Sequence, residues 1–541
     1  MNLWPQGHEP SPQALGERMY REGLLPSGEP MKGLVRGDVP VEGAAFACAS
    51  CHMQAGLGSA EGGVATPATN GEKLFRPWFR YHPFLEGEER RVLPESIRDA
   101  LRRPAYTEAD LERALTEGVA PDGRDLSDIM PRYALSSEEA RLLVRYLKGL
   151  SATASPGVTQ TTLKFATIIA GEVSAEDRAD FLEVLRYRIE AHNRRGAHRD
   201  TASFRALAAL EGALAFRDWS LSVWELKGPP GSWADQLEAH LRREPVFAVL
   251  SGLSYGPWEP IHAFSERHRL PCILPLTEHP QPQGPGWYTL YFSKGPRQEG
   301  EAAAAYLSNL IQKGAEERPI LQVVASTPEA QAVAKGFDAA WADRGHDAVH
   351  TVRLRPGQRP DAASLLRRIR EKGAPILLLW AGPESYAGLR SVKDPSALVL
   401  LSTSLLGPRL WELPQEIRDQ ARLAYPYRLF RPPASMMGQI AASPAAGSSL
   451  SLVAGDTHRR IRSRAFTVMK TMEEVISHME RNFYRDHLLD TFSMLMDDLE
   501  TDYERLSYGP GQRFASKGCY VVRMPKGDLH GFIKDSDWVI H

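Results

Sequence analysis

Two cysteines and a histidine, in the run Cys48-Ala49-Ser50-Cys51-His52, have the residue types and spacing with the most specific chemistry in this chain. Thiols three positions apart lie on one helical turn, where each can form a thioether to a vinyl group of haem. The next residue then points its imidazole at the iron. The sequence therefore predicts one covalently attached c-type haem, with Cys48 and Cys51 as the attachment points and His52 as an axial ligand.

Zinc binding and thiol–disulfide exchange are the alternative uses of such a cysteine pair. A zinc site needs a second pair of ligands, and the other cysteines, Cys272 and Cys519, are single and far apart. Thiol exchange of the thioredoxin kind needs a strand before the pair, whereas residues 41–47 are rich in Gly and Ala. Haem attachment is favoured over both. Cys272 and Cys519 are either two buried thiols or one disulfide.

The composition is that of a soluble globular protein with more than one domain. The 541 residues exceed one ordinary core, and 43% of them are hydrophobic and 24% charged. A net charge of -2 gives no overall attraction to nucleic acid, so none is expected as a partner. No apolar run approaches the roughly 18 to 20 residues that cross a bilayer, so no transmembrane segment is expected.

The first residues lack the basic and apolar regions of a signal peptide. Covalent haem, however, is normally installed after export. We therefore expect a periplasmic or otherwise exported protein whose signal has been removed, with Met1 added or renumbered. The alternative is a cytoplasmic protein with a chance motif.

Helical patterns surround the cysteine motif. They cover Gln13 to Glu22, Arg91 to Arg102, Thr107 to Glu117 and Glu139 to Leu150. The last helix has a capping-box start at Ser136 to Glu139. A loop is expected over the Gly- and Pro-rich span that ends at Val41, and a second loop places Met130 directly before Pro131.

This order of helix, Cys-x-x-Cys-His, loop, Met-Pro and terminal helix resembles the class I cytochrome c fold. It is most similar to monohaem cytochromes and to cytochrome subunits associated with periplasmic dehydrogenases. The resemblance implies an all-α haem domain over residues 1–152, with Met130 as the distal ligand of the iron. A thioether ligand raises the potential and suits electron transfer. His82 is the runner-up, because Met53 is too close to His52 to reach the opposite face of the haem.

Small residues with Pro156 and Gly157 indicate an interdomain linker at residues 153–159. Beyond it, apolar runs alternate with amphipathic helices, which predicts doubly wound parallel α/β sheets. The expected strands are Leu163 to Ala170, Ser220 to Glu225, Val246 to Leu250, Cys272 to Leu276, Trp287 to Phe292, Ile320 to Ala325, Ile376 to Trp380 and Ala397 to Leu401. The expected helices are Ala175 to Ala191, Trp233 to Leu241, Glu299 to Lys313, Glu329 to Arg344 and Ala362 to Lys372.

Residues 160–541 resemble the type I periplasmic binding fold, specifically the amino-acid and amide substrate-binding proteins of ABC transporters. The residues that carry the resemblance are Glu244 to Gly252, Leu270 to Thr277, Gln298 to Leu307, Lys335 to Trp341 and Tyr508 to Tyr520. The resemblance implies a two-lobed α/β domain with a small ligand in the interlobe cleft. Gly171 to Glu176 replaces the Gly/Ala-rich loop that usually helps to hold that ligand.

A ligand of such a domain is expected outside the carboxyl ends of the strands. Ser251 and Gly252 offer a hydroxyl and a backbone N–H to a carboxylate, and Tyr255 or Trp258 offers an apolar face. The full set of cleft candidates is Ser251, Gly252, Ser254, Tyr255 and Thr277 on one lobe, with Trp380, Ala381 and Gly382 across from them. Turn formation and cleft packing are the alternative roles of these residues. Arg428 and Arg431 are either anion contacts or solvated surface.

The chain shows no dinucleotide fingerprint and no nucleophile triad, so it is not expected to be an enzyme. The methionines of a helix from about Arg464 to Asn482 are expected to pack in a core. The leading hypothesis is an exported monohaem cytochrome for one-electron transfer, whose α/β domain docks a redox partner, a dehydrogenase or another cytochrome, or senses a small molecule. The alternatives are a periplasmic binding protein for an amino acid, amide or organic acid with a redox-reporting haem, and a dehydrogenase's cytochrome subunit.

Overall fold

The computed structural model describes residues 10–61, 64–79, 102–196, 216–281, 286–312, 318–358, 376–386, 398–429, 457–498, 501–509, 511–525 and 532–540. Two compact units make up the chain. Unit 1 consists of residues 1–163, 194–218 and 474–494, and unit 2 of residues 164–193, 219–473 and 495–541. The first boundary falls close to the expected linker, but unit 1 also contains two segments from later in the sequence. His82, Arg431 and the helix expected at Ala362 to Lys372 lie outside the described residues.

The helices of unit 1 confirm the periodicity of the sequence. They are α1 (Pro12–Glu22), α2 (Cys48–His52), α3 (Gly71–Leu74), α5 (Glu108–Thr116), α6 (Ser137–Gly149) and α18 (Arg485–Ser493). Ser136 and Glu139 form the expected capping box at the start of α6. Helices α1 and α6 cross closely at Gly16, where a Cβ would lie 2.4 Å from the carbonyl oxygen of Leu142. The helix expected from Arg91 lies outside the described residues up to Arg102, which is in a short strand.

Short strands also belong to unit 1, so the expectation of an all-α domain is wrong. Strands β1 (Lys32–Val35), β2 (Val39–Glu42) and β7 (Arg132–Tyr133) form an antiparallel sheet in the order β2-β1-β7. Arg36 and Gly37, with φ of 51° and 87°, make the tight turn between β1 and β2. Two further pairs are β3 (Ser59–Glu61) with β4 (Val64–Thr66) and β5 (Trp78–Phe79) with β6 (Arg102–Arg103). Strands this short cannot show the alternation of apolar and polar side chains that predicts a strand, so the sequence predicts a loop before Val41.

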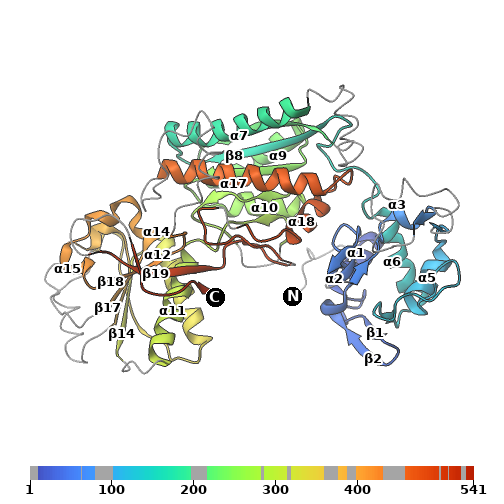
Figure 1. Cartoon of the computed structure of the whole chain (residues 1–541), viewed down its shortest axis with the longest axis horizontal. Coiled ribbons are helices and arrows are strands. Elements are labelled where there is room, and N and C mark those ends of the chain that lie inside the picture. The colour runs from blue at the N-terminus through green and yellow to red at the C-terminus, as the bar shows by residue number, and fades with distance from the viewer. Residues whose placement is uncertain are drawn as a thin grey trace. The chain divides into compact units, whose positions relative to one another are not determined.

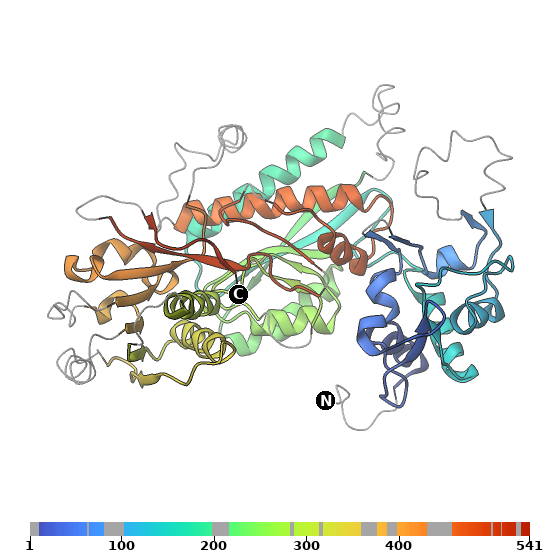
Figure 2. The ribbon, with the colours of Figure 1, turned by 60° about the horizontal axis from the view of Figure 1, so that its bottom comes forward.

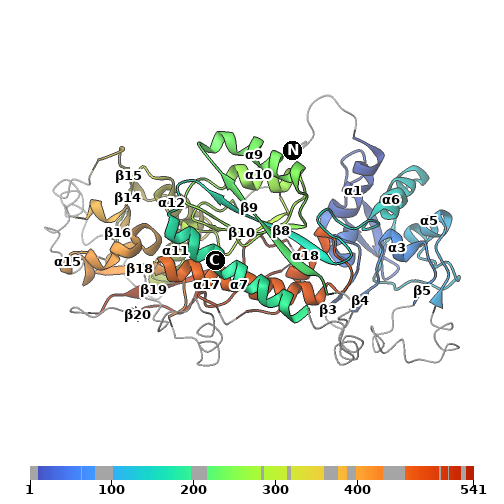
Figure 3. The ribbon, with the colours of Figure 1, turned by 90° about the horizontal axis from the view of Figure 1, so that it is seen from above.

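Unit 2 contains two sheets. The first has the order β13-β11-β10-β8-β9 and consists of β8 (Thr162–Ala170), β9 (Asp218–Leu226), β10 (Ala248–Ser254), β11 (Cys272–Ile273) and β13 (Thr289–Leu290), with β12 (Leu276–Thr277) paired to β10. Helix α7 (Ala175–Gly196) covers one face, and α9 (Trp233–Arg243) and α10 (Glu259–Arg267) cover the other (Figure 3).

The second sheet has the order β15-β14-β16-β17-β18-β19-β20. Its parallel strands are β14 (Ile320–Val324), β15 (His350–Arg353), β16 (Ile376–Trp380), β17 (Leu398–Ser402) and β18 (Ala421–Tyr425). Strand β19 (Gly518–Arg523) runs antiparallel to β18 and pairs with β20 (Ile533–Lys534) and β21 (Val539–Ile540). The remaining elements are α11 (Pro296–Gln312), α12 (Pro328–Ala342), α14 (Thr403–Leu406) and α15 (Gln415–Arg418), with short helices at Pro230–Ser232, Pro383–Ser385 and Gly407–Glu412.

The two sheets share one strand order, in which the first strand in sequence lies between the second and the third. That order is the doubly wound arrangement that places a ligand site outside the carboxyl ends of the strands. Helices α11 and α12 pack closely against each other because Gly300 and Gly336 have no side chains. A Cβ on Gly300 would lie 1.9 Å from the carbonyl oxygen of Val333. The predicted doubly wound α/β fold is confirmed.

Helix α17 (Thr457–His478) runs beside α7 (Figures 1 and 2). Arg462 Nη1 lies 2.6 Å from Asp180 Oδ1, and Arg188 Nη2 lies 2.9 Å from Glu473 Oε2, so ion pairs join the two helices. Met469 and Met472 on α17 are fully buried, which confirms that they pack in a core. Within the described residues, no helix combines the length and the apolar character that crossing a membrane requires.

Candidate functional sites

A pocket in unit 2 lies where the physics of doubly wound sheets predicts a ligand site. Its residues follow the ends of β12 and β13 in the first sheet and of β17 and β18 in the second, and α17 and Tyr503 complete it. They are Pro275, Thr277, Glu278, Pro280, Tyr291, Phe292, Ser293, Gly295, Ser404, Pro426, Tyr427, Arg464 and Tyr503. Both lobes of unit 2 therefore contribute to one pocket.

Arg464, on α17, supplies the strongest charge in the pocket. Its Nη2 donates a 2.6 Å hydrogen bond to the hydroxyl of Tyr427, while its Nε is buried without a partner among the described residues. The guanidinium carbon lies 5.4 Å from the ring centroid of Tyr427 and 5.6 Å from that of Tyr503. No carboxylate of the described residues forms an ion pair with Arg464. Burial lowers its pKa, but Tyr427, Tyr503, Glu278 and Asp502 outweigh burial, so the pKa is raised and the side chain stays charged.

Aromatic rings form the walls around this guanidinium. Phe292 stacks on Tyr503 with the ring centroids 5.6 Å apart and the planes at 16°, and Tyr427 meets Tyr503 at 5.5 Å. Burial raises the pKa of Tyr503 far above its ordinary value, so its hydroxyl is neutral. The walls therefore present flat apolar surfaces and neutral hydroxyl groups to the pocket.

The pocket is narrow in this conformation. Its enclosed cavity volume is about 20 Å³, and the whole hollow, its open mouth included, measures about 410 Å³. A volume of about 20 Å³ holds roughly one water molecule. An organic ligand would therefore need the two lobes to part, as lobes joined around a cleft can do by hinge motion.

Glu299, on α11, supports the side of the pocket formed by Ser404. Its carboxylate accepts a hydrogen bond from the backbone N–H of Ser404 at 3.2 Å and another from the Ser404 hydroxyl, and Thr403 Oγ1 lies 3.4 Å away. Glu299 is fully buried. Burial raises its pKa to about 7, against the opposing effect of the hydrogen bonds. The carboxyl group therefore titrates near neutral pH.

An ion pair joins the two lobes beside the pocket. His279, which follows the pocket residue Glu278, places Nε2 3.0 Å from Oε1 of Glu329 on α12. The hydrogen bond to Glu329 raises the pKa of His279 and lowers the pKa of Glu329. The contact therefore holds the lobes together most strongly when His279 is charged.

In unit 1, the Cys-x-x-Cys-His motif forms the short helix α2, in which neither cysteine forms a disulfide and His52 is mostly buried. The Nδ1 atom of His52 lies 2.8 Å from the carbonyl oxygen of Pro67. A carbonyl oxygen only accepts, so Nδ1 carries the proton and Nε2 keeps its lone pair. Burial lowers the pKa of His52, which favours the same neutral form. A neutral imidazole fixed by its second nitrogen is the form that binds metals.

Met130 borders the same core cluster as Cys48 and Ala49. Phe46, two residues before the motif, is 37% exposed, and Ile129, directly before Met130, is 45% exposed. Leu34 of β1 is 44% exposed. Strand β1 pairs with β7, two residues beyond Met130. Unit 1 thus exposes large apolar side chains next to both the motif and the methionine.

A family model described as periplasmic binding protein matches residues 223–394. A substrate-binding protein of an ABC transporter from Sphaerobacter thermophilus has a similar structure, with a TM-score of 0.50 and 11% sequence identity over 70% of this chain and 98% of its own.

Unit 2 has the periplasmic-binding-protein fold.

Two further solved structures cover a similar share of the chain. A branched-chain amino acid ABC transporter protein from Thermus thermophilus with bound valine has a TM-score of 0.48 and 11% identity over 71% of this chain and 97% of its own. A fatty acid ABC transporter substrate-binding protein from Thermomonospora curvata has a TM-score of 0.47 and 14% identity over 72% and 95%. No curated protein matches the chain.

Of the cleft residues predicted for this fold, Thr277 lines the pocket. Ser251, Gly252 and Ser254 do not, because β10 extends four residues further than the expected strand and contains them. The Ser251 hydroxyl donates to Leu274 O at 2.8 Å, and Ser254 Oγ accepts from Gly256 N at 3.1 Å. Gly252 packs under Trp258, whose ring a Cβ would approach to 2.6 Å. These three residues build the strand end and do not line this pocket, so their binding role stays a prediction.

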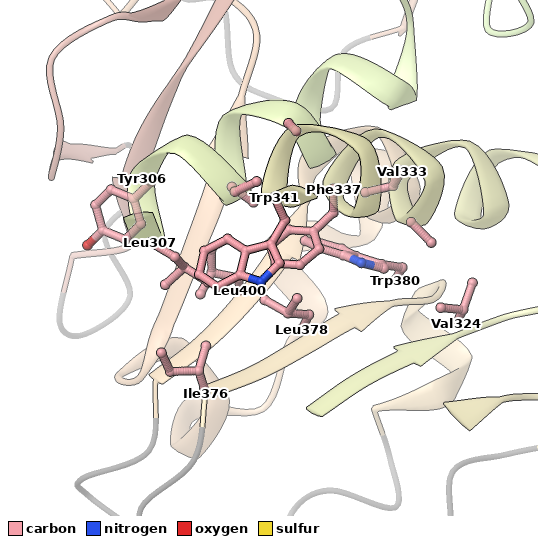
Figure 4. Close-up of a cluster of buried hydrophobic side chains, with 14 of the residues drawn as sticks. Tyr306, Leu307, Val324, Val333, Phe337, Trp341, Ile376, Leu378, Trp380 and Leu400 are labelled. Atoms are coloured by element: carbon pink, nitrogen blue, oxygen red, sulfur yellow. The ribbon is translucent and has the colours of Figure 1, made fainter. Parts of the chain in front are cut away.

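The remaining predicted residues also lie outside the lining of the pocket. Trp380 is fully buried among Phe337, Leu378 and Leu400 in the core of the second sheet (Figure 4), and its Nε1 donates to Gln322 Oε1 at 2.7 Å. Tyr255 is 44% exposed and donates its hydroxyl to Asp177 Oδ2 at 2.7 Å. Trp258 lies in the core of the first sheet, and Ala381 and Gly382 follow β16. Arg428 donates to the carbonyl oxygen of Glu504.

Arg464 is a pocket residue that the sequence did not reveal. The methionines of its helix predict packing in a core, and Met469 and Met472 are fully buried. The available signal was an arginine within the apolar pattern of that helix, at the start of the expected segment. Tyr427 and Tyr503 belong to irregular segments, which periodicity does not place.

Cys272 and Cys519 are two buried free thiols, so the disulfide alternative is excluded. Within the described part of the chain, no group of three or more His, Cys, Asp and Glu side chains is arranged to hold a metal ion. A zinc site made of such residues is therefore absent from that part.

Proposed function

We propose that unit 2 binds a small organic anion, an amino acid or a short organic acid, with its carboxylate on Arg464. The observation that carries this proposal is the charged guanidinium in the pocket, whose Nε is buried without a partner and which forms no ion pair with a described residue. Glu278 and Asp502 act on this charge without an ion pair to it, and a carboxylate from a ligand would add the direct contact that a buried charge needs. The planar fork of arginine matches the two oxygens of a carboxylate.

The surroundings support a carboxylate with a compact body. Tyr427 and Tyr503 lie against the guanidinium and restrict its orientation, while Thr277, Ser293 and Ser404 provide hydroxyl groups around it. Glu278 is exposed and lies in the same lining, where it can attract the ammonium group of an amino acid. Arg464 and Glu278 thus offer opposite charges to the two ends of a zwitterion.

Isothermal titration with matched pairs tests this proposal. Valine against valinol and propionate against propionamide differ only in the group that would face Arg464. We expect the carboxylate member of at least one pair to bind and to raise the Tm of the chain, and its partner to bind at least about tenfold more weakly. Equal binding of acid and neutral partner, or no binding by any amino acid, organic acid or amide, would overturn the proposal.

A second function, electron transfer by one c-type haem in unit 1, is supported by His52. The tautomer fixed by Pro67 leaves Nε2 for iron, and Cys48 and Cys51 stand on the same helical turn and form no disulfide. Each thiol would add its S–H across a vinyl group, which needs no oxidant. The exposed apolar side chains near Met130 suit a large apolar group. When bound, the haem would supply one-electron exchange between Fe(III) and Fe(II).

The haem proposal is tested by producing the chain in an exporting host with haem-attachment machinery. We expect a pyridine haemochrome spectrum of one thioether-linked haem per chain and reversible reduction. A chain without covalent haem would refute this second function without affecting the first. With both functions, the chain is an exported electron carrier whose binding domain senses a small anion, and its redox partner is a dehydrogenase or another cytochrome.

A further inference from the structure

The residue that follows His52 has an unusual backbone conformation. Met53 adopts φ of 65° and ψ of 168°, in a region that is populated almost only by glycine. A side chain remains in such a conformation only where the surrounding structure fixes it. Met53 is also the C-cap of helix α2, directly after His52.

The contacts that fix this turn come from three distant parts of the sequence. Asp490 on α18 accepts from the backbone N–H of Gln54 at 3.1 Å through Oδ1 and from that of Ala55 at 2.7 Å through Oδ2. The hydroxyl of Tyr20 donates to Met53 O at 2.9 Å, and that of Ser151 donates to Ala55 O at 2.8 Å. Asp490 alone binds two successive amides.

Helix α18 is itself anchored to the N-terminal helix. Asp486 Oδ2 lies 2.5 Å from Arg21 Nη2, and Arg21 Nη1 donates to Gln54 Oε1 at 2.9 Å. Asp490 is 1% exposed, and Leu488, Leu489 and Phe492 around it are buried. Figure 3 shows α18 in red next to the blue N-terminal segment. A helix more than 430 positions away in sequence is thus part of the same compact unit as the motif.

We propose that Asp490 is a positioning residue for the haem motif, and that α18 holds the Met53 turn so that His52 faces its iron site. The inference rests on the proposed haem attachment for its purpose, but the clamp on the turn is a property of the chain before any haem is bound. The two hydrogen bonds to Asp490 replace the helical carbonyl partners that the amides of Gln54 and Ala55 lack once α2 has ended.

The test combines Asp490→Ala and Asp490→Asn with Met53→Gly. Loss of Asp490 should speed hydrogen exchange of the Gln54 and Ala55 amides in the haem-free chain by about tenfold or more. Asp490→Asn should show most of this faster exchange, because only the oxygen of its side-chain amide can accept a hydrogen bond. Covalent haem per chain, measured after maturation in the exporting host, should fall in both variants.

Met53→Gly separates positioning from general stability. Glycine adopts the observed φ and ψ without strain, so Asp490→Ala with Met53→Gly should recover covalent haem, although the amides still exchange quickly. Asp497→Ala, which removes an exposed carboxylate paired with Arg505 at 3.2 Å, is the control and should change neither measurement. Unchanged amide exchange in Asp490→Ala, or no recovery by Met53→Gly, would overturn the proposal. A wild-type chain without haem would refute haem attachment. The hydrogen-exchange test of the two hydrogen bonds to Asp490 would remain valid.

Discussion

The hydroxyl of Tyr427 lies 2.6 Å from Nη2 of Arg464, and this is the only hydrogen bond from that guanidinium to a described residue. Tyr427 follows a strand of the second sheet, whereas Arg464 is on α17, so the pair forms only when the strand end and the helix meet. A neutral hydroxyl does not balance a buried charge. Arg464 therefore keeps hydrogen-bonding capacity at Nε that no described residue uses.

Arg464→Met should separate binding from stability. Removing a buried charge that forms no ion pair with a described residue should leave the ligand-free Tm unchanged or raised, while the affinity for a carboxylate ligand should fall by about 2 kcal/mol or more. Titration calorimetry and thermal unfolding measure the two effects. Arg462→Met is the matched control on the same helix, because Arg462 pairs with Asp180 outside the pocket. Arg462→Met should lower Tm and leave the affinity unchanged. A lower Tm with unchanged affinity in Arg464→Met would contradict the proposed role of Arg464.

Glu299 should make the stability of unit 2 depend on pH. Its folded pKa of about 7 exceeds the ordinary 4.5, so the folded state holds the proton more tightly than the unfolded state. The free energy of unfolding should therefore fall as pH rises from about 4.5 to 7, by roughly 3 kcal/mol. Glu299→Gln keeps an acceptor for Ser404 and should remove this slope. Denaturant unfolding at pH 5 and pH 8 measures this change in the free energy of unfolding. An equal pH dependence in the wild-type chain and in Glu299→Gln would contradict the assignment to Glu299.

The ion pair of His279 and Glu329 should contribute most at low pH. The raised pKa of His279 means that the contact contributes fully below pH of about 6.5 and is lost as pH rises through the raised value. His279→Asn should cost about 0.5 to 1 kcal/mol of unfolding free energy at pH 6 and little at pH 9. Urea unfolding at both pH values provides the comparison, and a cost that grows with pH would be inconsistent with the pair.

Met130 should control the sixth position of the proposed haem. Met130→Ala is expected to lower the reduction potential and to let carbon monoxide bind the ferrous haem, because a thioether raises the potential and closes the site. Redox titration and the ferrous–CO spectrum report the change. An unchanged spectrum would assign the ligand to another residue, such as His82. Leu126→Ala is the control, since Leu126 borders the same cluster without a ligating atom.

Long elements were predicted well because burial on one face leaves a period in the sequence. The helices α1, α5 and α6 and the strands β8, β14 and β16 lie within a few residues of their expected bounds. Short elements were missed, as the sheet of β1, β2 and β7 shows, since two to four residues cannot display a period. Within the pocket, Thr277 was predicted because it directly follows the expected strand Cys272 to Leu276, and in the structure it is the last residue of β12.

The sequence by itself determined the haem-type motif, whose five residues are adjacent, and the doubly wound class of unit 2, which follows from local periodicity. Only the tertiary structure decided which polar groups have partners. It placed the Ser251 hydroxyl on a carbonyl within the fold, left Nε of Arg464 without a partner among the described residues, and brought Asp490 to the turn after His52. Such pairings join residues from distant segments, and no local pattern records a contact that forms only when those segments pack together.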